Sequence, residues 1–303
     1  MSILLQAELP LPVFRHGKVR DTYDLGDKLL IIATDRISAF DFVLPCGIPD
    51  KGRVLNQLSA FWFEKTAHIM PNHLIKTIYN ADSVKPYLPP GVNLPDYVIG
   101  RSMIVTKTEL IPAECVVRGY LSGSAWAEYQ EAGTIAGVSL PKNLQESQEL
   151  PEPMFTPTTK AENEHDQPLS KQELENLIGK ATAQELEEKS LAIYQYARAY
   201  ARSRDIIIAD TKFEFGFSDG KIILIDELLT PDSSRFWDTS QYSIGRSQPS
   251  FDKQPVRDWL VASGWNKQPP VPTLSPEIIE STTRLYHEAY YRLTGRTLEN
   301  VSG

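Results

Sequence analysis

The sequence predicts an α+β fold built as two lobes that share a cleft. Apolar runs typical of strands and segments with helical spacing follow one another in mixed order along the chain, as is usual in this class. The chain has 303 residues, of which 41% are hydrophobic, enough for one large domain or two lobes with a substantial core. We place an N-terminal α+β lobe at residues 1–112 and a C-terminal lobe at residues 113–303.

The first third of the chain is predicted to hold several strands and one helix. The apolar run at residues 28–34 is typical of a buried strand, and residues 97–108 and 114–118 are predicted to be two further strands. Residues 86–95 are rich in Pro and Gly and are expected to form a surface loop. Residues 54–70 are predicted to be helical because apolar side chains recur at helical spacing, at Leu55, Leu58, Phe61 and Trp62.

The middle of the chain contains a polar stretch followed by two helix starts. Residues 141–168 carry several prolines and are expected to form a working or mobile loop. Ser170 with Glu173, and Thr182 with Glu185, each fit the capping box, in which hydroxyl and carboxylate satisfy the first free N–H groups of a helix. The second helix is expected to end near residue 204, with an apolar stripe formed by Leu186, Ile193, Tyr194, Ala197 and Tyr200.

The last third of the chain is predicted to contain a β-hairpin and a terminal helix. Residues 206–217 and 222–228 have the composition of two strands, and Asp219-Gly220 between them is a typical hairpin turn. The chain is expected to end in a helix over residues 276–295.

Charge and cysteine content exclude several classes of protein. The net charge of −8 argues against nucleic-acid binding, because phosphate backbones require a basic surface. No apolar run is long enough to span a bilayer, and no signal peptide is expected. The two cysteines, Cys46 and Cys115, are far apart and lie in no metal-ligand spacing, which fits a reducing cytosol. We therefore expect a cytoplasmic protein whose partners are small molecules.

The most informative stretch is the first strand of the predicted hairpin. Because side chains alternate between the two faces of a strand, Asp210, Lys212 and Glu214 are predicted to share one face. The opposite face carries the aromatic residues Phe213, Phe215 and Phe217. Three charged side chains on one face of the strand, with aromatic side chains on the other face, indicate a polar cleft. The plainer alternative is a solvated strand face with alternating charges.

The second strand of the hairpin ends in two carboxylates, Asp226 and Glu227. One of them must point into the same cleft: a two-residue turn favours Glu227, and a turn longer by one residue favours Asp226. In either register, two carboxylates converge with one ammonium group. Adjacent carboxylates repel unless a cation joins them. Mg²⁺ held by one or two carboxylates and by nucleotide phosphates is the usual solution.

Two further segments carry groups that bind anions. Arg118 precedes Gly123 and Ser124, which open a predicted helix, and Arg235 lies just after the hairpin. Arginine offers a planar fork that fits a phosphate, and a helix start offers free N–H groups. The alternative is an arginine in a surface ion pair and a serine that only caps the helix. Residues 17–21 (GKVRD) have the composition to fold over a polyphosphate, although they are neither a P-loop nor a Rossmann fingerprint.

Taken together, these segments resemble one enzyme family. Residues 110–118 (LIPAECVVR), followed by Gly123-Ser124, and residues 208–216 (IADTKFEFG) resemble the two signatures of the phosphoribosylaminoimidazole-succinocarboxamide synthase (SAICAR synthetase) family. The resemblance covers nearly the whole chain, whose length resembles the longer, yeast-like form. Four further blocks look similar and stand in the family's order, namely residues 17–21, 34–41, 155–160 and 226–235.

The resemblance implies a fold and an activity. The fold is the family's two-lobed α+β arrangement, with a nucleotide cleft like that of ATP-grasp enzymes and kinases. The activity is ATP-dependent joining of L-aspartate to the carboxylate of 5-amino-1-(5-phosphoribosyl)imidazole-4-carboxylate in purine biosynthesis, through an acyl phosphate, with ATP and Mg²⁺ as cofactors and a monomer as the working unit. The rival readings are a small-molecule kinase and a non-catalytic nucleotide-binding protein.

The resemblance also implies roles for individual residues. It assigns Mg²⁺ to Glu214 and Asp226, which favours Asp226 in the open question of register, and it places Lys212 with them as a catalytic residue. The ATP contacts implied are those of Lys18, Arg20, Glu114, Val116 and Lys212. The substrate contacts implied are those of Arg118, Ser124, Arg235, Asp35, Ser38, Lys160 and Asp166. Residues 144–153 carry no implied role.

Overall fold

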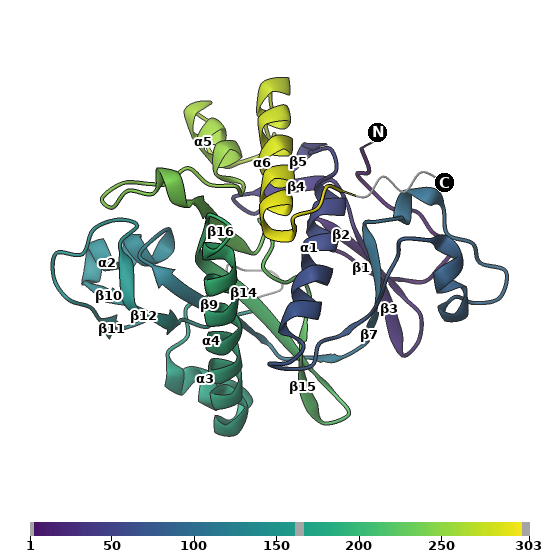
Figure 1. Cartoon of the computed structure of the whole chain (residues 1–303), viewed down its shortest axis with the longest axis horizontal. Helices are drawn as coiled ribbons and strands as arrows, with labels where there is room; N and C mark the ends of the chain where they lie inside the picture. The colour runs from purple at the N-terminus through teal and green to yellow at the C-terminus, as the bar shows by residue number, and fades with distance from the viewer. Residues whose placement is uncertain (1–2, 161–166, 299–303) are drawn as a thin grey trace.

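The N-terminal part of the chain forms an antiparallel sheet of five strands. The structure, a computed structural model, describes residues 3–160 and 167–298. The strands stand in the order β1-β2-β3-β7-β6 (Figure 1). Their bounds are Val13–His16 (β1), Arg20–Asp24 (β2), Lys28–Ala33 (β3), Ser102–Thr106 (β7) and Leu74–Thr77 (β6).

Both faces of this sheet are covered, and the segment predicted as a surface loop covers one of them. Leu30 and Ile32 of β3 pack with Leu94 and Val98, which follow the 3₁₀ helix Ala81–Tyr87 (η1). The strand predicted at residues 97–108 is shorter, because the 3₁₀ helix Asp96–Val98 (η2) occupies its start. The proline-rich stretch is thus a loop, as predicted, but its apolar side chains cover one face of the sheet.

Helix α1, Lys51–Thr66, covers the other face of the five-stranded sheet. It was predicted from residue 54 and begins three residues earlier, after Asp50, whose backbone is left-handed with φ 61°. Its apolar stripe includes Leu58 and Trp62, which are fully buried. Lys51, in the first turn, is also fully buried, which local sequence does not indicate.

The C-terminal part contains a sheet of seven strands with β14 at its centre. Strand β14, Ile206–Ser218, pairs with β9, β15, β16 and β8. Helix α4, Lys180–Arg202, covers one face with the predicted stripe, of which Ile193 and Tyr194 are fully buried. The other strands are Glu109–Leu110 (β8), Ala113–Tyr120 (β9), Glu149–Phe155 (β12), Thr158–Thr159 (β13), Lys221–Ile225 (β15) and Ser234–Asp238 (β16).

Two expectations for the middle of the chain are wrong. The stretch predicted as a loop contributes β12 and β13, which both pair with β9. Pairing with β9 therefore decides the structure here, although the stretch is polar and contains prolines. The capping box at Ser170 and Glu173 is present at the start of helix α3, Lys171–Ile178. The one expected at Thr182 is absent, because α4 begins at Lys180, directly after Gly179.

The ribbon β4–β5 and helices α5 and α6 form a smaller layer beside α1. The ribbon β4–β5 packs its apolar side chains, such as Ile37 and Leu44, against helices α5 and α6. The terminal helix was predicted correctly, whereas α5 was not predicted. The bounds are Arg36–Ala39 (β4), Phe42–Gly47 (β5), Gln254–Ala262 (α5), Pro276–Thr294 (α6), Ser124–Ala132 (α2), Thr134–Ile135 (β10), Val138–Ser139 (β11) and Thr239–Gln241 (η3).

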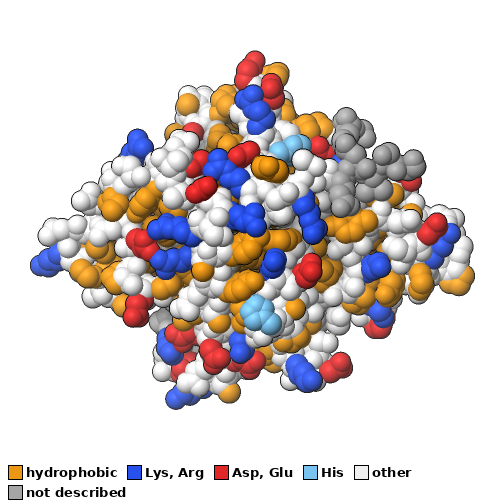
Figure 2. Space-filling model, viewed as in Figure 1, with side chains coloured by type: hydrophobic (Ala, Val, Ile, Leu, Met, Phe, Trp, Pro, Cys, Tyr) orange, Lys and Arg blue, Asp and Glu red, His pale blue; other side chains and the backbone are white. Residues whose placement is uncertain are grey.

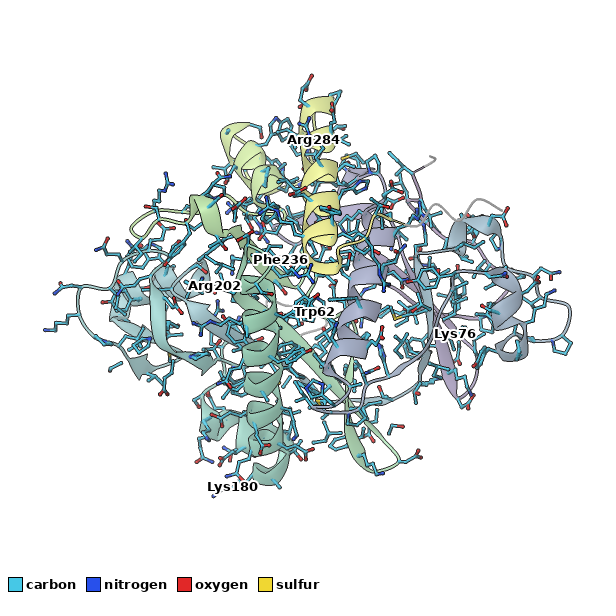
Figure 3. The ribbon with its side chains drawn as sticks, in the orientation of Figure 1. Trp62, Lys76, Lys180, Arg202, Phe236 and Arg284 are labelled. Carbon is cyan, nitrogen blue, oxygen red and sulfur yellow. The ribbon has the colours of Figure 1, made fainter. Side chains whose placement is uncertain are left out.

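One hydrophobic core joins the two sheets. It unites Leu58 and Trp62 of α1 with Ile193 of α4 and Phe236 of β16, and Trp62 and Phe236 lie near the middle of the molecule (Figure 3). The core therefore crosses residue 112, where we predict the boundary between lobes. On the face shown in Figure 2, acidic and basic side chains are interspersed. No helix within residues 3–160 and 167–298 has both the length and the apolar character needed to cross a membrane.

Candidate active site

Strand β14 presents its polar side chains in successive rows. Asp210 lies directly opposite Arg118 of β9 and Arg235 of β16. Further along, Lys212 lies opposite Val116 of β9, and Glu214 lies opposite Ile225 of β15. On the other face, Phe213 and Phe215 are fully buried in the main core, whereas Phe217 is only partly buried. The predicted division of β14 into a charged face and an aromatic face is therefore confirmed.

The hairpin turn is the two-residue one, at Asp219-Gly220, since Ser218 pairs with Lys221. Strict alternation from this register turns Glu227, but not Asp226, toward the charged face. The strand ends at Ile225, however, and Asp226 has a left-handed backbone with φ 68°, which breaks the alternation. Both carboxylates consequently reach the same guanidinium group, so the expectation that only one of them faces the cleft is wrong.

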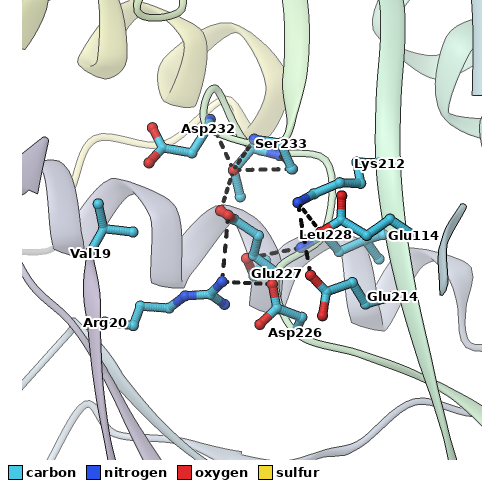
Figure 4. Close-up of polar contacts among 12 residues, drawn as sticks. Val19, Arg20, Glu114, Lys212, Glu214, Asp226, Glu227, Leu228, Asp232 and Ser233 are labelled. Atoms are coloured by element: carbon cyan, nitrogen blue, oxygen red, sulfur yellow. Dashed lines mark hydrogen bonds and ion pairs between the residues drawn. The ribbon is translucent and has the colours of Figure 1, made fainter. Parts of the chain in front are cut away.

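That guanidinium belongs to Arg20, at the start of β2 (Figure 4). Its Nη2 lies 2.6 Å from Oδ2 of Asp226 and 3.7 Å from Oε1 of Glu227. Burial favours the neutral form of Asp226, but Arg20 outweighs it and lowers the pKa of that carboxyl group. For Glu227, burial raises the pKa despite Arg20, and Asp232 and Asp226 raise it further. Two carboxylates therefore share one guanidinium group on this side of the cluster.

Two lysines occupy the other side of the same cluster. Nζ of Lys212 lies 2.6 Å from Oε1 of Glu114 and 3.9 Å from Oε1 of Glu214 (Figure 4). Lys160 forms an ion pair with the second oxygen of Glu214. Burial lowers the pKa of Lys212, but Glu214 and Glu114 outweigh this effect and raise it, so the side chain is a fixed positive charge.

The donors present suit a magnesium ion that is shared with a nucleotide. Within the part of the chain that the structure describes, no three His, Cys, Asp or Glu side chains form a ready-made metal site. Mg²⁺ seldom needs one, because it binds one or two carboxylates and completes its shell with phosphate oxygens and water. Lys160 and Lys212 both act on Asp226 as well as on Glu214, which places the two carboxylates in one electrostatic cluster.

Arg118, Ser124 and Arg235 come together at the other end of the charged face. Arg118 donates from Nε to Oγ1 of Thr156 at 3.0 Å and from Nη2 to Oγ of Ser124 at 3.2 Å. Arg235 forms an ion pair with Asp210. Gly123 has φ 58°, and a Cβ there would clash with the Arg235 guanidinium, so glycine is needed for this approach. The structure thus brings Arg235 together with Arg118 and Ser124, which lie in a different segment of the sequence.

Arg36 holds the loop that carries Lys18 in place. This arginine donates from Nη2 to the carbonyl of Gly17 at 3.0 Å and from Nε to that of Lys18 at 3.1 Å. Its guanidinium also pairs with Asp21 at 2.8 Å. Lys18 itself is 56% exposed and pairs with Asp41 at 2.6 Å. Sequence reasoning gave Arg36 no role, although it lies in a block that resembles the family.

Other residues assigned by resemblance lie in different surroundings. Asp35 is fully buried, 2.9 Å from Arg101, and accepts from the N–H of Gly52 at 3.0 Å, so it supports the start of α1. Ser38 lies on β4 opposite Val43. The carbonyl of Val116, a residue for which the resemblance implies an ATP contact, accepts from the N–H of Thr156 at 2.8 Å. Asp166 lies outside the described residues. These substrate and nucleotide roles stay predictions.

A buried group of charges next to the site was missed by sequence reasoning. Asp232 lies 2.7 Å from Nζ of Lys51 and 3.1 Å from Nζ of Lys253, and it accepts from the hydroxyl of Tyr286 at 2.6 Å. These partners come from α1, the start of α5 and α6, so the loop before Arg235 is tied to three elements. The only signal in the sequence is Lys51 at a helix start, and a lysine in that position is usually exposed on the surface.

Comparisons with known proteins agree with one another. Residues 13–272 match the family model described as SAICAR synthetase. The chain is 51% identical over 294 residues to the phosphoribosylaminoimidazole-succinocarboxamide synthase of Thermodesulfovibrio yellowstonii, covering 97% of this chain and 99% of the relative. It is 52% identical over 298 residues to the protein of the same name from Desulfosudis oleivorans, with the same coverage of 97% and 99%.

Solved structures give the same result. A SAICAR synthase from Saccharomyces cerevisiae in complex with SAICAR superposes with a TM-score of 0.89 at 43% identity, covering 97% of this chain and 99% of that one. A SAICAR synthetase in complex with ADP has a TM-score of 0.68 at 26% identity, covering 95% and 99%.

Proposed function

The chain belongs to the SAICAR synthetase family, and from that premise we propose how its residues divide the work of the family's reaction. The chain is an ATP-dependent ligase of purine biosynthesis. It joins L-aspartate to the carboxylate of 5-amino-1-(5-phosphoribosyl)imidazole-4-carboxylate, below called the ribonucleotide, and yields the succinocarboxamide, ADP and phosphate.

We propose that the reaction passes through an acyl phosphate. A carboxylate does not react with an amine at neutral pH, because an oxide is a very poor leaving group. In the first step a carboxylate oxygen of the ribonucleotide attacks the γ-phosphorus of ATP, and ADP leaves. In the second step the amine of aspartate attacks the acyl carbon, phosphate leaves and the amine loses its proton. The protein has to position three anionic partners and offset their repulsion.

The nucleotide end of the site is proposed at the carboxylate cluster. Glu214 and Asp226 hold Mg²⁺, which neutralises charge on the phosphates, and Lys212 lies beside them. Support comes from geometry, because the carboxylates of Glu214 and Asp226 belong to one group of charged side chains with Arg20, Lys160 and Lys212. Further ATP contacts are proposed for Lys18, Arg20, Glu114 and Val116.

The ribonucleotide end is proposed at the arginines. Arg118, Ser124 and Arg235 bind the ribose phosphate, because two guanidinium forks and a hydroxyl converge there. Asp35, Ser38, Lys160 and Asp166 are proposed on the substrate side. The observation that carries the proposal is strand β14 itself. Asp210 and Glu214 are four residues apart, or about 13 Å on an extended strand, so the strand separates a phosphate-binding end from a metal-binding end.

The direct test of this division is an ADP-release assay with the ribonucleotide, with and without aspartate. A ligase of this mechanism releases ADP in stoichiometric amounts with the amide product only when aspartate is present. A small-molecule kinase, the second candidate, releases ADP in multiple turnovers without aspartate. Sustained ADP release that is independent of aspartate would refute the ligase mechanism.

The acyl phosphate is tested by labelling the carboxylate of the ribonucleotide with ¹⁸O. The attacking oxygen stays with phosphorus when the amine displaces phosphate, so one label should appear in inorganic phosphate after a single turnover. Phosphate free of label would exclude this route and indicate activation of another group.

We further propose that the protein works as a monomer in the cytoplasm. Both cysteines in the described residues, Cys46 and Cys115, are free, which fits a reducing compartment. Sedimentation equilibrium at working concentrations tests the monomer, and a mass of twice the 34.1 kDa of the chain would contradict it.

A further inference from the structure

Three charged residues form a row across the seven-stranded sheet. Arg118 of β9, Asp210 of β14 and Arg235 of β16 occupy directly opposed positions on three adjacent antiparallel strands. Side chains at opposed positions leave the same face of a sheet with Cβ atoms about 4.5–5.5 Å apart. The row therefore brings two guanidinium groups to one place with a single carboxylate between them.

The carboxylate contacts both arginines through one oxygen. Oδ2 of Asp210 accepts from Nη1 of Arg235 and lies 3.5 Å from Nη1 of Arg118. The same oxygen accepts from Oγ of Ser122 at 3.3 Å. The Asp210 side chain is only 8% exposed, whereas that of Arg235 is 29% exposed. The Arg118 side chain is nearly as buried as that of Asp210, at 11% exposed, so Arg235 is the most exposed member of the row.

Electrostatics explains why this carboxylate is needed. Burial lowers the pKa of Arg118, which shows that the site by itself disfavours its charge, whereas Asp210 is the main cause of the raised pKa of Arg235. Two buried guanidinium groups repel each other and turn apart unless an anion joins them. With Asp210 the row has a net charge of +1, since two positive charges and one negative charge are present.

We propose that Asp210 is a positioning residue that fixes the two guanidinium groups so that both converge on the phosphate of the ribonucleotide. The inference rests on the proposed role of Arg118 and Arg235 and adds a residue that does not itself touch the phosphate. It follows that the geometry of the arginines, rather than the sum of charge, determines the affinity for this substrate.

The substitution Asp210→Asn separates these two explanations by the sign of its effect. If only total charge mattered, removing a carboxylate would raise the local charge from +1 to +2 and strengthen phosphate binding. If Asp210 fixes the arginines, the ribonucleotide should bind about ten- to a hundredfold more weakly, a loss typical of misplaced binding groups. Calorimetric titration with the ribonucleotide, and separately with ADP and Mg²⁺, measures both affinities. The affinity for ADP should not change.

Kinetics adds a readout that a general loss of structure would not give. The KM for the ribonucleotide should rise, whereas kcat at saturation and the KM for ATP should stay within about threefold, because binding rather than chemistry is affected. If Asp210→Asn does not fold, Asp210→Glu keeps the charge and displaces it by one methylene. This variant should also raise the KM for the ribonucleotide, whereas a purely electrostatic role predicts no change.

A matched control is Asp238→Asn. Asp238 is a buried carboxylate at the end of β16, on the same sheet, and lies 3.1 Å from Arg292. It should change neither affinity. Unchanged or tighter ribonucleotide binding in Asp210→Asn, with weaker binding in Arg118→Ala, would overturn the positioning role and leave the phosphate site intact. Unchanged binding in Arg118→Ala and Arg235→Ala would refute the phosphate site itself, and the inference with it.

Discussion

At the scale of single residues, the surroundings of an aspartate decide what it does in this protein. Asp35 is fully buried and supports the start of α1 through the N–H of Gly52. Asp210 lies between two arginines, and Asp226 lies in the carboxylate cluster that faces Arg20. Asp226 differs from the other two because it stands beside further carboxylates, Glu214 and Glu227, and adjacent carboxylates are suited to a metal.

The first prediction concerns the metal. Glu214→Gln and Asp226→Asn should each abolish most of the activity without unfolding the protein, because each removes a ligand charge but keeps the shape of the side chain. Turnover and thermal melting across a Mg²⁺ titration measure this. Near-normal turnover of either variant at ordinary Mg²⁺ concentrations would contradict the metal assignment. Glu227→Gln is the comparison, and a greater loss there would assign the metal to Glu227.

The second prediction concerns the phosphate. Arg118→Ala and Arg235→Ala should weaken the binding of the ribonucleotide far more than the binding of ATP or aspartate. Each removes a charge-assisted contact worth about 1.5–3 kcal/mol, or about ten- to a hundredfold in affinity. Lysine should restore little, because it lacks the planar fork. The Michaelis constants for all three substrates measure the effect. A rise confined to the KM for ATP would show that these arginines contact the nucleotide instead.

At the scale of elements, β14 shows how much a strand's periodicity can specify. Its alternation correctly predicts the charged and the aromatic face, because the side-chain period of a strand is fixed by the backbone. Helix starts are less certain. Ser170 and Thr182 have the same local pattern, yet only Ser170 caps a helix, since Gly179 ends α3 and starts α4.

The third prediction tests this difference between two helix starts. Ser170→Ala should lower the free energy of unfolding by about 1 kcal/mol, because Oγ of Ser170 accepts from the N–H of Glu173 at 3.3 Å. Thr182→Ala is the matched control and should cause no comparable loss, since Thr182 lies inside α4. Urea unfolding of both variants measures it, and equal losses would show that the cap contributes nothing specific.

At the scale of the whole molecule, contacts between distant segments hold the site together. The main core joins α1 and α6 with α4 and β14, and a fully buried ion pair links Lys51 of α1 to Asp232 in the loop before Arg235. Arg20 of the five-stranded sheet meets Asp226 from the seven-stranded one. The site therefore lies where the two sheets join, and its geometry depends on the fold of nearly the entire described chain.

The fourth prediction concerns the ion pair of Asp232. Asp232→Asn leaves Lys51 and Lys253 buried without their carboxylate and should destabilise the protein by about 3–5 kcal/mol at pH 7. Burial favours neutral Asp232, but Lys253 and Lys51 lower its pKa below the usual value of 3.8. A carboxyl group with a lowered pKa adds stability above its unfolded pKa and loses that contribution as the pH falls below it.

The difference between the wild type and Asp232→Asn should therefore shrink from pH 6 to pH 3 in urea unfolding. Asp82→Asn is the control, because Asp82 pairs with Lys85 on the surface, where both side chains are more than half exposed. It should cause no measurable change. A constant difference across this pH range would show that the carboxylate charge of Asp232 is not the source of stability.

The sequence by itself determined the class of the fold, the two faces of β14, the apolar stripe of α4, the terminal helix and the family. These features are local or periodic, so neighbouring residues are enough to specify them. Only the tertiary structure decided that residues 149–159 form strands, that Asp226 and Glu227 face one guanidinium, and that Lys51 is buried against Asp232. Arg20 and Asp226 are 206 residues apart in the chain, and periodicity states which face a side chain occupies but not which distant segment meets it. The partners of the charged residues, and with them the geometry of the site, are set by how the two sheets pack around their shared core.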